Sequence, residues 1–304
     1  FTAGHLLLAP RTPIIAQLFV RGLAMSVRKT ALCFTGGKDS TLTLHLLAQP
    51  LKEGIDEDLA ARLAKCAGCK VEMLVTFIPA GQPPDFKAHP LDFMKLQSEA
   101  LGIPLLTFET HSPYLESYRE NIKKLRDEHN IQVLATGDMM DVSNGFMQKA
   151  VQGTDVELLT PLWEMERKKV LALVWAYEMK SLVTCINVTK FAPPPPKPAS
   201  DSSADTTPDV PAEDTARRVP PRDDDAPFEP STMLGQMLDR GLWEHVLVPC
   251  KDKFGVDECG ELGEYRTMAC DGSLFRRRLE VTFREEQSGV YRYLRITSSA
   301  LVDK

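Results

Sequence analysis

The residues with the clearest chemical potential form one short run near the start of the chain: Thr35, Gly36, Gly37, Lys38, Asp39 and Ser40. Two adjacent glycines let the backbone turn tightly and bring its N–H groups against an anion. The hydroxyls of Thr35 and Ser40 can donate to phosphate oxygens, and Lys38 can add positive charge. Asp39 would repel phosphate, so we expect it to cap a helix or to bind Mg²⁺. The run therefore indicates a site for a phosphate chain.

The surrounding elements favour the same interpretation. A strand expected over Val27–Thr35 leads into the run, and a helix expected over Ser40–Leu47 follows it. The positive end of that helix would then face the anion. The spacing differs from the GxxxxGK[ST] loop of P-loop NTPases, so that class is excluded. A glycine turn capped by Asp39 or Ser40 is the structural alternative.

Short β-rich runs alternate with longer helical periods through the first two thirds of the chain, which is typical of βαβ units. The expected strands are Val27–Thr35, Val71–Phe77, Leu105–Glu109, Gln132–Thr136 and Leu182–Val188. The expected helices are Ser40–Leu47, Leu91–Leu101, Tyr114–His129 and Glu166–Lys180, with a charged helical excursion at 55–70. Right-handed crossovers predict an α/β fold with a five-stranded, doubly wound parallel sheet, similar to a Rossmann fold.

Composition divides the chain into an extension at 1–24, a main domain at 25–190, a linker at 191–230 and a C-terminal subdomain at 231–304. The linker holds 11 of the 22 prolines and nine acidic against four basic residues. Such a stretch cannot bury enough apolar surface to offset its chain entropy, so we expect disorder. It would serve as a passive tether or dock a proline-reading partner.

Two further expectations concern the ends of the chain. The extension contains Arg11 and Arg21 and no acidic residue, which suits a targeting peptide, although Met25 is also a natural start. Near the C-terminus we expect a helix over Leu234–Leu247 and a small antiparallel pair, Leu279–Phe283 with Val290–Ile296, which together form a cap.

Overall composition excludes several classes of protein. The 304 residues include 43% of the hydrophobic class, which is enough for one large domain or a main domain with a smaller one. A net charge of −6 argues against nucleic-acid binding by phosphate neutralisation. Seven cysteines, an odd number, do not form a disulfide framework, so we expect a reducing, cytoplasmic compartment. No apolar run reaches the roughly 18 residues of a membrane span.

Five motifs together resemble one known family. The run at 35–40 is similar to the pyrophosphate loop of the adenine nucleotide alpha hydrolases. Within that superfamily the chain resembles the diphthine-ammonia ligases, on stretches that cover most of 27–190 and 234–275. The matching motifs are Phe86–Leu91 with Gln97–Leu105, Ala135–Asp138 with Asp141, Pro161–Trp163 with Arg167, and Gly255–Thr267 with Asp271 and Phe275.

This resemblance implies an ATP-dependent ligase that forms a C–N bond. Enzymes of the superfamily split ATP between the α and β phosphates. The family adenylates the carboxylate of diphthine, a modified histidine on the translocating elongation factor, and uses ammonium to form diphthamide. The implied cofactors are ATP and Mg²⁺. The implied partners are the elongation factor and ammonium, with no membrane and no nucleic acid.

The resemblance also implies roles for individual residues. The whole run from Thr35 to Ser40 would hold the β and γ phosphates, and Phe77 and Ile78 would pack on adenine. Asp39 and Asp138 would bind Mg²⁺, and Asp138 with Asp141 would alternatively orient ammonium. Glu261 and Glu264 would bind ammonium or the cationic part of diphthine. The catalytic set is Lys38, Asp39, Asp138, Asp141, Glu261 and Glu264, and the cofactor-binding set adds His89 and Gly137.

Each role has a structural alternative. Gly137 and Asp138 can turn the chain and cap a helix, and Trp163 can anchor the core. Glu261 and Glu264 can belong to a surface turn, and His89 can fill a polar pocket.

The sequence also departs from the family. The stretch after Asp141 lacks the family's arginine, Arg266 replaces a histidine, and Ser273 replaces a proline. All three departures lie on the substrate side, which leaves two competing functions open. One is a tRNA-thiolating enzyme that uses the pair Cys66 and Cys69. The other is a nucleotide-binding protein without catalytic activity.

Overall fold

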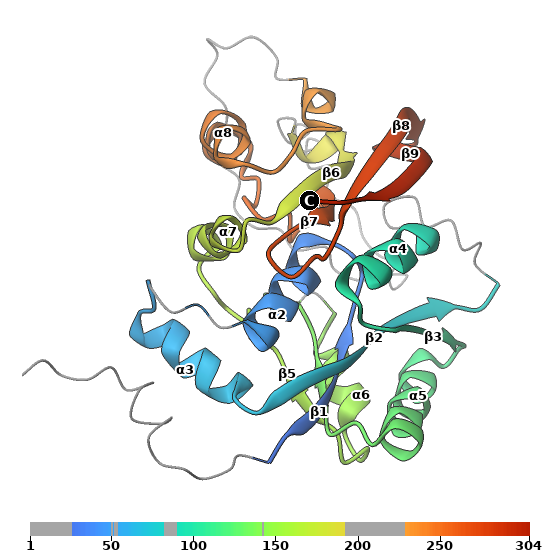
Figure 1. Cartoon of the computed structure of the whole chain (residues 1–304). Helices are drawn as coiled ribbons and strands as arrows, with labels where there is room; N and C mark the ends of the chain where they lie inside the picture. Colours follow the sequence, from blue (N-terminus) through green and yellow to red (C-terminus); the bar gives the residue numbers. More distant parts are fainter. Residues whose placement is uncertain (1–25, 50, 52–53, 82–89, 142, 192–228) are drawn as a thin grey trace, which may run out of the picture.

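The computed structural model describes residues 26–49, 51, 54–81, 90–141, 143–191 and 229–304. The extension at 1–24, nearly all of the linker and His89 lie outside the described residues. The described chain forms two sheets with helices around and between them (Figure 1).

The first sheet has five strands, all parallel, in the order β3-β2-β1-β4-β5. This confirms the predicted α/β fold class. The strands are β1 (Arg28–Cys33), β2 (Cys69–Pro79), β3 (Leu105–Thr110), β4 (Val133–Ala135) and β5 (Glu157–Leu159). The order reverses between β1 and β4, so the crevice at their carboxyl ends is the place where open α/β sheets bind ligands.

The prediction of the fifth strand was wrong. The expected strand Leu182–Val188 falls in β6 (Lys180–Asn187), which pairs antiparallel with β7 and β9 in the second sheet. The fifth place in the parallel sheet belongs to β5, a strand of three residues. Such a short strand leaves little trace in the sequence, whereas β6 is buried along seven consecutive residues and resembles a parallel strand.

Helices cover both faces of the parallel sheet. They are α2 (Lys38–Ala48), α3 (Glu57–Cys66), α4 (Leu91–Leu101), α5 (Tyr114–His129), α6 (Phe146–Val151) and α7 (Arg167–Ala176). Side chains of α5 and α6 pack with Ala31 on one face, and side chains of α2, α4 and α7 pack with Leu32 on the other. This follows from β geometry, since neighbouring side chains of a strand point to opposite faces. The bounds of α4 and α5 agree with the prediction, and α6 was missed.

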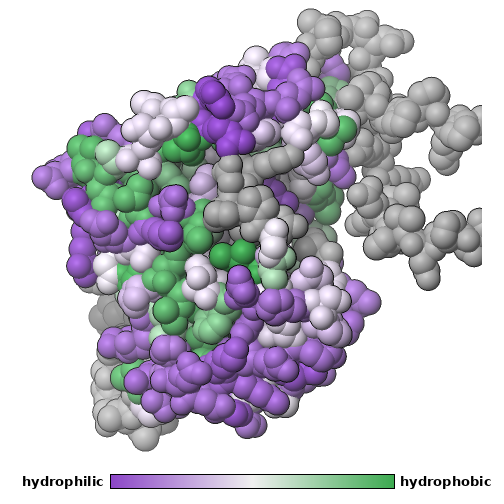
Figure 2. All heavy atoms as spheres, turned by 90° about the vertical axis from the view of Figure 1, so that its right-hand side faces the viewer, coloured by the Kyte–Doolittle hydropathy of each residue, from purple (hydrophilic) through white to green (hydrophobic). Residues whose placement is uncertain are grey.

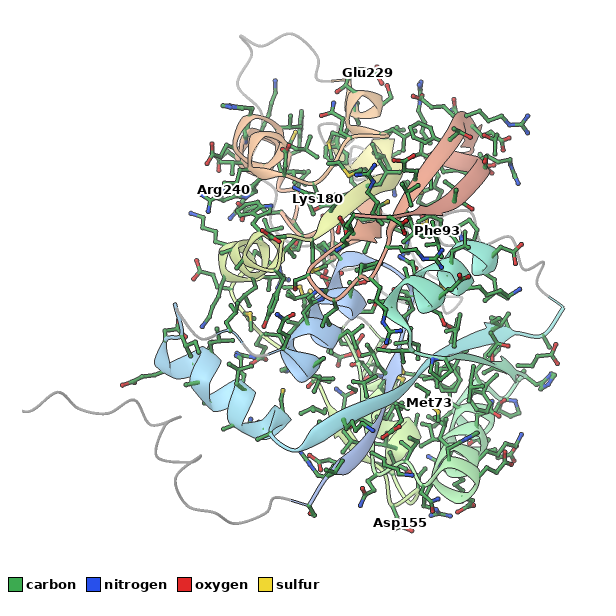
Figure 3. All side chains as sticks on the ribbon, in the orientation of Figure 1. Met73, Phe93, Asp155, Lys180, Glu229 and Arg240 are labelled. Atoms are coloured by element: carbon green, nitrogen blue, oxygen red, sulfur yellow. The ribbon has the colours of Figure 1, made fainter. Side chains whose placement is uncertain are left out.

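The second sheet is antiparallel, in the order β7-β6-β9-β8. Its other strands are β7 (Tyr265–Asp271), β8 (Arg278–Ser288) and β9 (Tyr291–Val302). The pairing of β8 with β9 confirms the predicted C-terminal pair. In Figure 3, Met73 on β2 and Lys180 on β6 mark the two sheets, which lie on opposite sides of α2 and α4. The cap predicted for 231–304 therefore shares its sheet with a strand from before the linker.

The helix expected over Leu234–Leu247 begins later in the structure. Residues 230–233 form the short helix η2 (Pro230–Met233), and Met237 bridges to Leu182 of β6. The helical segment then runs through α8 (Arg240–Leu242), η3 (Trp243–Leu247) and α9 (Val248–Phe254). The side chain of Asp239 caps its start by accepting a hydrogen bond from the N–H of Leu242 at 2.8 Å.

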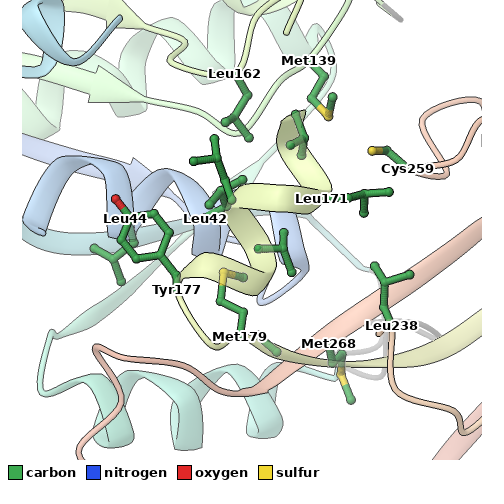
Figure 4. Close-up of a cluster of buried hydrophobic side chains, with 14 of the residues drawn as sticks. Leu42, Leu44, Met139, Leu162, Leu171, Tyr177, Met179, Leu238, Cys259 and Met268 are labelled. Atoms are coloured by element: carbon green, nitrogen blue, oxygen red, sulfur yellow. The ribbon is translucent and has the colours of Figure 1, made fainter. Parts of the chain in front are cut away.

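One continuous apolar cluster joins the two sheets. It includes Leu42 on α2, Leu171 on α7 and Met268 on β7, all of which lie together in Figure 4. Because this cluster crosses from one sheet to the other, the parallel and antiparallel sheets share a core. The face in Figure 2 is hydrophilic along its upper and lower edges, with hydrophobic side chains gathered between them. Among the described residues, no helix is both long and apolar enough to cross a membrane.

Candidate functional site

A cavity of about 310 Å³ lies at the carboxyl ends of β1, β2 and β4. Its volume is at the lower end of the range for small-molecule sites. The segments that follow β1 and β4 supply most of its lining, β2, α5 and α6 add to it, and Glu261 is the lining residue from the C-terminal subdomain. Among the predicted site residues, the cavity brings together Thr35, Asp39, Ser40, Phe77, Gly137, Asp138 and Glu261.

The run at 35–40 forms a turn that leads directly into α2. Gly36 has φ +73°, a conformation that favours glycine, and Gly37 is the N-cap residue of α2. The Ser40 hydroxyl donates to the Gly37 carbonyl at 3.2 Å and lies 3.4 Å from the Thr35 hydroxyl. The turn therefore presents hydroxyl groups and a helix N-terminus on the side of the cavity.

Gly137 lets the loop after β4 approach this helix N-terminus. A Cβ atom at Gly137 would lie 2.7 Å from the carbonyl carbon of Asp39 and 2.7 Å from the backbone nitrogen of Ser40. Any larger residue would separate the two loops. Gly137 thus places Asp138 and Asp39 on the same wall of the cavity.

The buried side chain of Lys38 lies behind the cavity wall. Its Nζ contacts Asp39 Oδ2 at 2.8 Å and Glu261 Oε1 at 3.5 Å. Burial by itself lowers the pKa of Lys38, but the two carboxylates hold it well above its ordinary value. Lys38 therefore offsets the negative charge of Asp39 and Glu261. This explains how a loop that binds phosphate can contain a carboxylate. Its direct contact with phosphate stays a prediction.

Asp39 and Asp138 fit the requirements of Mg²⁺. Asp39 Oδ1 is buried and has no hydrogen-bond partner among the described residues. Asp138 accepts a hydrogen bond from the Thr136 hydroxyl at 2.8 Å. Burial raises the pKa of Asp138, the Thr136 hydrogen bond lowers it, and Asp39 raises it. The described chain holds no cluster of three or more metal-ligating side chains. Two carboxylates are nevertheless enough where phosphate oxygens complete the Mg²⁺ shell.

Phe77 and Tyr118 form an aromatic wall of the cavity. Phe77 stacks on Tyr118 with ring centroids 4.3 Å apart, and Phe146 meets the edge of Tyr118 at 4.9 Å. Burial raises the pKa of Tyr118 to about 12, so the ring stays neutral. The predicted residue Phe77 lines the cavity, whereas its neighbour Ile78 does not. Tyr118 was not among the predicted site residues. Its position in the first turns of the helix expected at 114–129, which follows a strand of the parallel sheet, could have indicated that it lies near the cavity.

A loop at residues 257–264 brings Glu261 to the cavity. The Arg167 guanidinium holds this loop by donating to Asp257 Oδ2 at 2.7 Å, which joins two motifs that are distant in sequence. Burial raises the pKa of Glu261 to about 7, and Asp39 and Asp257 act in the same direction against Lys38 and Arg167. Glu261 is therefore an acidic group that ionises near neutral pH.

The structure separates the other predicted acidic residues from the cavity. Glu264 accepts hydrogen bonds from the N–H groups of Asp257 and Leu262, both at 3.0 Å, and so holds the 257–264 loop. Asp141 is exposed and accepts from the N–H groups of Ser143 and Gly145 before α6. Neither lines the cavity. Trp163 does not line it either, but its carbonyl accepts from Arg62 at 2.6 Å.

The cysteine pair lies at the other edge of the parallel sheet. Cys69 begins β2 and pairs in register with Arg28 at the start of β1. Both positions are at the amino ends of their strands, opposite to the cavity. Burial raises the pKa of Cys66 to about 12, which makes its thiol unreactive. The geometry gives this pair no contact with the candidate site.

Comparison with known proteins finds one matching family model and two similar solved structures. Residues 225–302 match the family model described as diphthamide synthase C-terminal domain. A search of curated proteins finds no match. One similar solved structure is described as a predicted subunit of tRNA methyltransferase from Methanocaldococcus jannaschii, with 18% identity over 49% of this chain and 75% of that chain, at a TM-score of 0.31.

A second solved structure is the U34-tRNA thiolase NcsA from Methanococcus maripaludis with its [4Fe-4S] cluster. It is 18% identical over 50% of this chain and 57% of that chain, with a TM-score of 0.31. At this degree of likeness, neither solved structure carries information about the activity of this chain.

Proposed function

Because residues 225–302 match the diphthamide synthase C-terminal domain, we propose that this chain is an ATP-dependent amide ligase. In this proposal it adenylates the diphthine carboxylate of the translation elongation factor and amidates it with ammonium. The position of Glu261 carries the proposal. The segment that matches the family places this carboxylate in the same cavity as the loop at 35–40.

The chain's own residues supply the phosphate side of the reaction. Backbone N–H groups at Gly37 and in the first turn of α2 would hold the β and γ phosphates, together with the hydroxyls of Thr35 and Ser40. Asp39 and Asp138 would hold Mg²⁺, since Asp39 Oδ1 is buried without a partner among the described residues. Lys38 holds Asp39 in place through its contact at 2.8 Å.

The aromatic wall would bind the adenine base. Phe77 presents a ring already stacked on Tyr118, so little side-chain entropy is lost on binding. ATP supplies AMP as a leaving group, without which a carboxylate is a poor electrophile. The half-enclosed cavity helps to exclude water, which would otherwise compete with ammonia for the activated carboxylate.

Glu261 would take the acceptor side of the reaction. It lines the same cavity as the aromatic wall and lies on a loop of the C-terminal subdomain. When ionised, its carboxylate would attract ammonium or the cationic part of diphthine. Glu264 supports it indirectly, because it holds the loop that carries Glu261.

The test uses the full chain with ATP, isotopically labelled ammonium and elongation factor that bears diphthine. We expect label in the modified histidine, and AMP only when acceptor and ammonium are both present. Asp39→Asn should abolish both signals, while Asp92→Asn, an exposed carboxylate at the start of α4, should leave them unchanged. ATP binding without product from any acceptor would instead favour a nucleotide-binding protein.

The tRNA-thiolating alternative receives no support from the position of its cysteines, which lie at the opposite edge of the sheet. Sulfur incorporation into tRNA by the full chain, lost on replacement of Cys66 and Cys69, would overturn the amide-ligase proposal.

A further inference from the structure

Gln97 of α4 is fully buried and joins three parts of the molecule. Its Nε2 donates to the Gly36 carbonyl at 2.8 Å and to the Ala269 carbonyl of β7 at 2.7 Å. The N–H of Ala269 also donates to the Gly36 carbonyl at 2.9 Å. The carbonyl of one loop glycine is thus held by donors from α4 and from the C-terminal sheet.

The orientation of the Gln97 amide follows from chemistry. An amide group has one donating and one accepting end, and both of its partners here are carbonyl oxygens. The opposite orientation would place three oxygens together. The Oε1 atom instead lies 2.2 Å from the point where a Cβ atom of Gly36 would stand. Gln97 therefore fits only beside glycine at position 36.

Holding the Gly36 carbonyl also fixes the next N–H group. In a trans peptide the C=O and N–H bonds point in opposite directions. The N–H of Gly37 must therefore point away from Gln97 and Ala269. Gly37 is buried, and its N–H donates to no described residue. A buried N–H without a partner is rare in proteins, and an anion would satisfy it.

We infer that Gln97 is a positioning residue for the phosphate loop, which turns the N–H of Gly37 toward the β and γ phosphates of a nucleotide. This inference rests on the proposed function, because it requires a nucleoside triphosphate in the cavity. It also gives the C-terminal sheet a role in nucleotide binding. The carbonyl and the N–H of Ala269 both contribute to the position of Gly36.

The experiment compares the affinities of the full chain for ATP and AMP by calorimetry in the presence of magnesium. AMP lacks the β and γ phosphates, so its binding affinity should not depend on the N–H of Gly37. We expect Gln97→Met to weaken ATP binding about tenfold, the effect of losing one good hydrogen bond, and to leave AMP binding unchanged. Gln97→Asn keeps the amide on a shorter side chain and should give an intermediate loss.

Asn121→Leu is the matched control. It removes another buried amide, on α5. This amide donates to the Glu109 carbonyl of β3 at 2.9 Å and, among the described residues, has no hydrogen bond to the loop at 35–40. It should lower stability without changing either affinity.

Equal losses for ATP and AMP in the Gln97 variants, or no loss for ATP, would overturn the inference. If Gln97→Met does not fold, the ATP and AMP affinities of Gln97→Asn provide the test. Failure of the unmodified chain to bind ATP would be a different result, since it would contradict the proposed function itself.

Discussion

The loop at 35–40 and the loop at 257–264 reach the same cavity from different sheets, and they are held in different ways. The first depends on distant partners, because Gln97 of α4 and Ala269 of β7 hold Gly36. The second is held both from within and from outside, because Glu264 accepts hydrogen bonds from the N–H groups of Asp257 and Leu262 in the same loop, and Arg167 of α7 donates to Asp257. The shape of the first loop is therefore coupled to distant parts of the fold, whereas the second loop keeps part of its support when a distant partner is lost.

The largest effect should come from breaking the contact at the first loop. Gly137→Ala would place a Cβ atom 2.7 Å from backbone atoms of Asp39 and Ser40, and one of the two loops must move. We expect AMP formation to fall roughly a hundredfold, because small displacements of reacting groups cost that much. Gly81→Ala is the control, since its Cβ would meet nothing within 4 Å, and its φ of +73° adds a backbone strain that Gly137→Ala does not carry. Equal activity of the two variants would contradict this account of Gly137.

In the second loop, we expect a substitution at Glu264 to lower the stability of the fold and a substitution at Glu261 to lower the activity. Glu264→Gln turns an acceptor into a donor that faces a backbone N–H, so we expect a loss of about 1–3 kcal/mol in the free energy of unfolding. Glu261→Gln should lower amide formation without such a loss. Urea unfolding and the product assay, applied to both variants, check this. If Glu264→Gln is as stable as the unmodified chain, the loop does not rely on its buried carboxylate.

The pH dependence of stability should test the environment of Glu261 in the second loop. Burial raises the pKa of Glu261 to about 7 from an ordinary value of 4.5. The folded chain therefore binds a proton that the unfolded chain releases between these values, and stability falls as pH rises through this range. Relative to the Glu261→Gln variant, we expect a loss of about 2–3 kcal/mol between pH 5 and pH 8. Parallel stability curves would contradict the raised pKa.

The smallest effect on activity should come from substitutions near the amino ends of the parallel strands. Replacing both Cys66 and Cys69 by alanine should change AMP formation less than twofold, because Cys66 ends α3 and Cys69 begins β2, at the end of the sheet opposite to the cavity. Unfolding measurements control for a loss of packing at Cys66. Loss of activity in a folded double variant would return the thiolation hypothesis to consideration.

Much of the fold and part of the site could be predicted from the sequence. The glycine pair marked the loop at 35–40, and the apolar periods of Leu91–Leu101 and Tyr114–His129 marked α4 and α5 at their bounds. These signals are local. The placement of β6 was not predictable, because a fully buried strand has the same pattern in a parallel and an antiparallel sheet.

The supports of the site were harder to predict for a related reason. Gln97 and Ala269 meet Gly36 through contacts of long sequence separation, and nothing in their local pattern marks them. Glu261 and Glu264 are three residues apart and look equivalent in the sequence. Only the turn between them determines that one faces the cavity and the other faces the backbone.

The most direct test of the central claim is the identity of the nucleotide product. The full chain is incubated with α-labelled ATP, diphthine-bearing elongation factor and ammonium, and the labelled product is separated. Because the loop at 35–40 is proposed to hold the departing β and γ phosphates, we predict labelled AMP with pyrophosphate. Labelled ADP would contradict the account, since it would mean that the bond between the β and γ phosphates is the one that breaks.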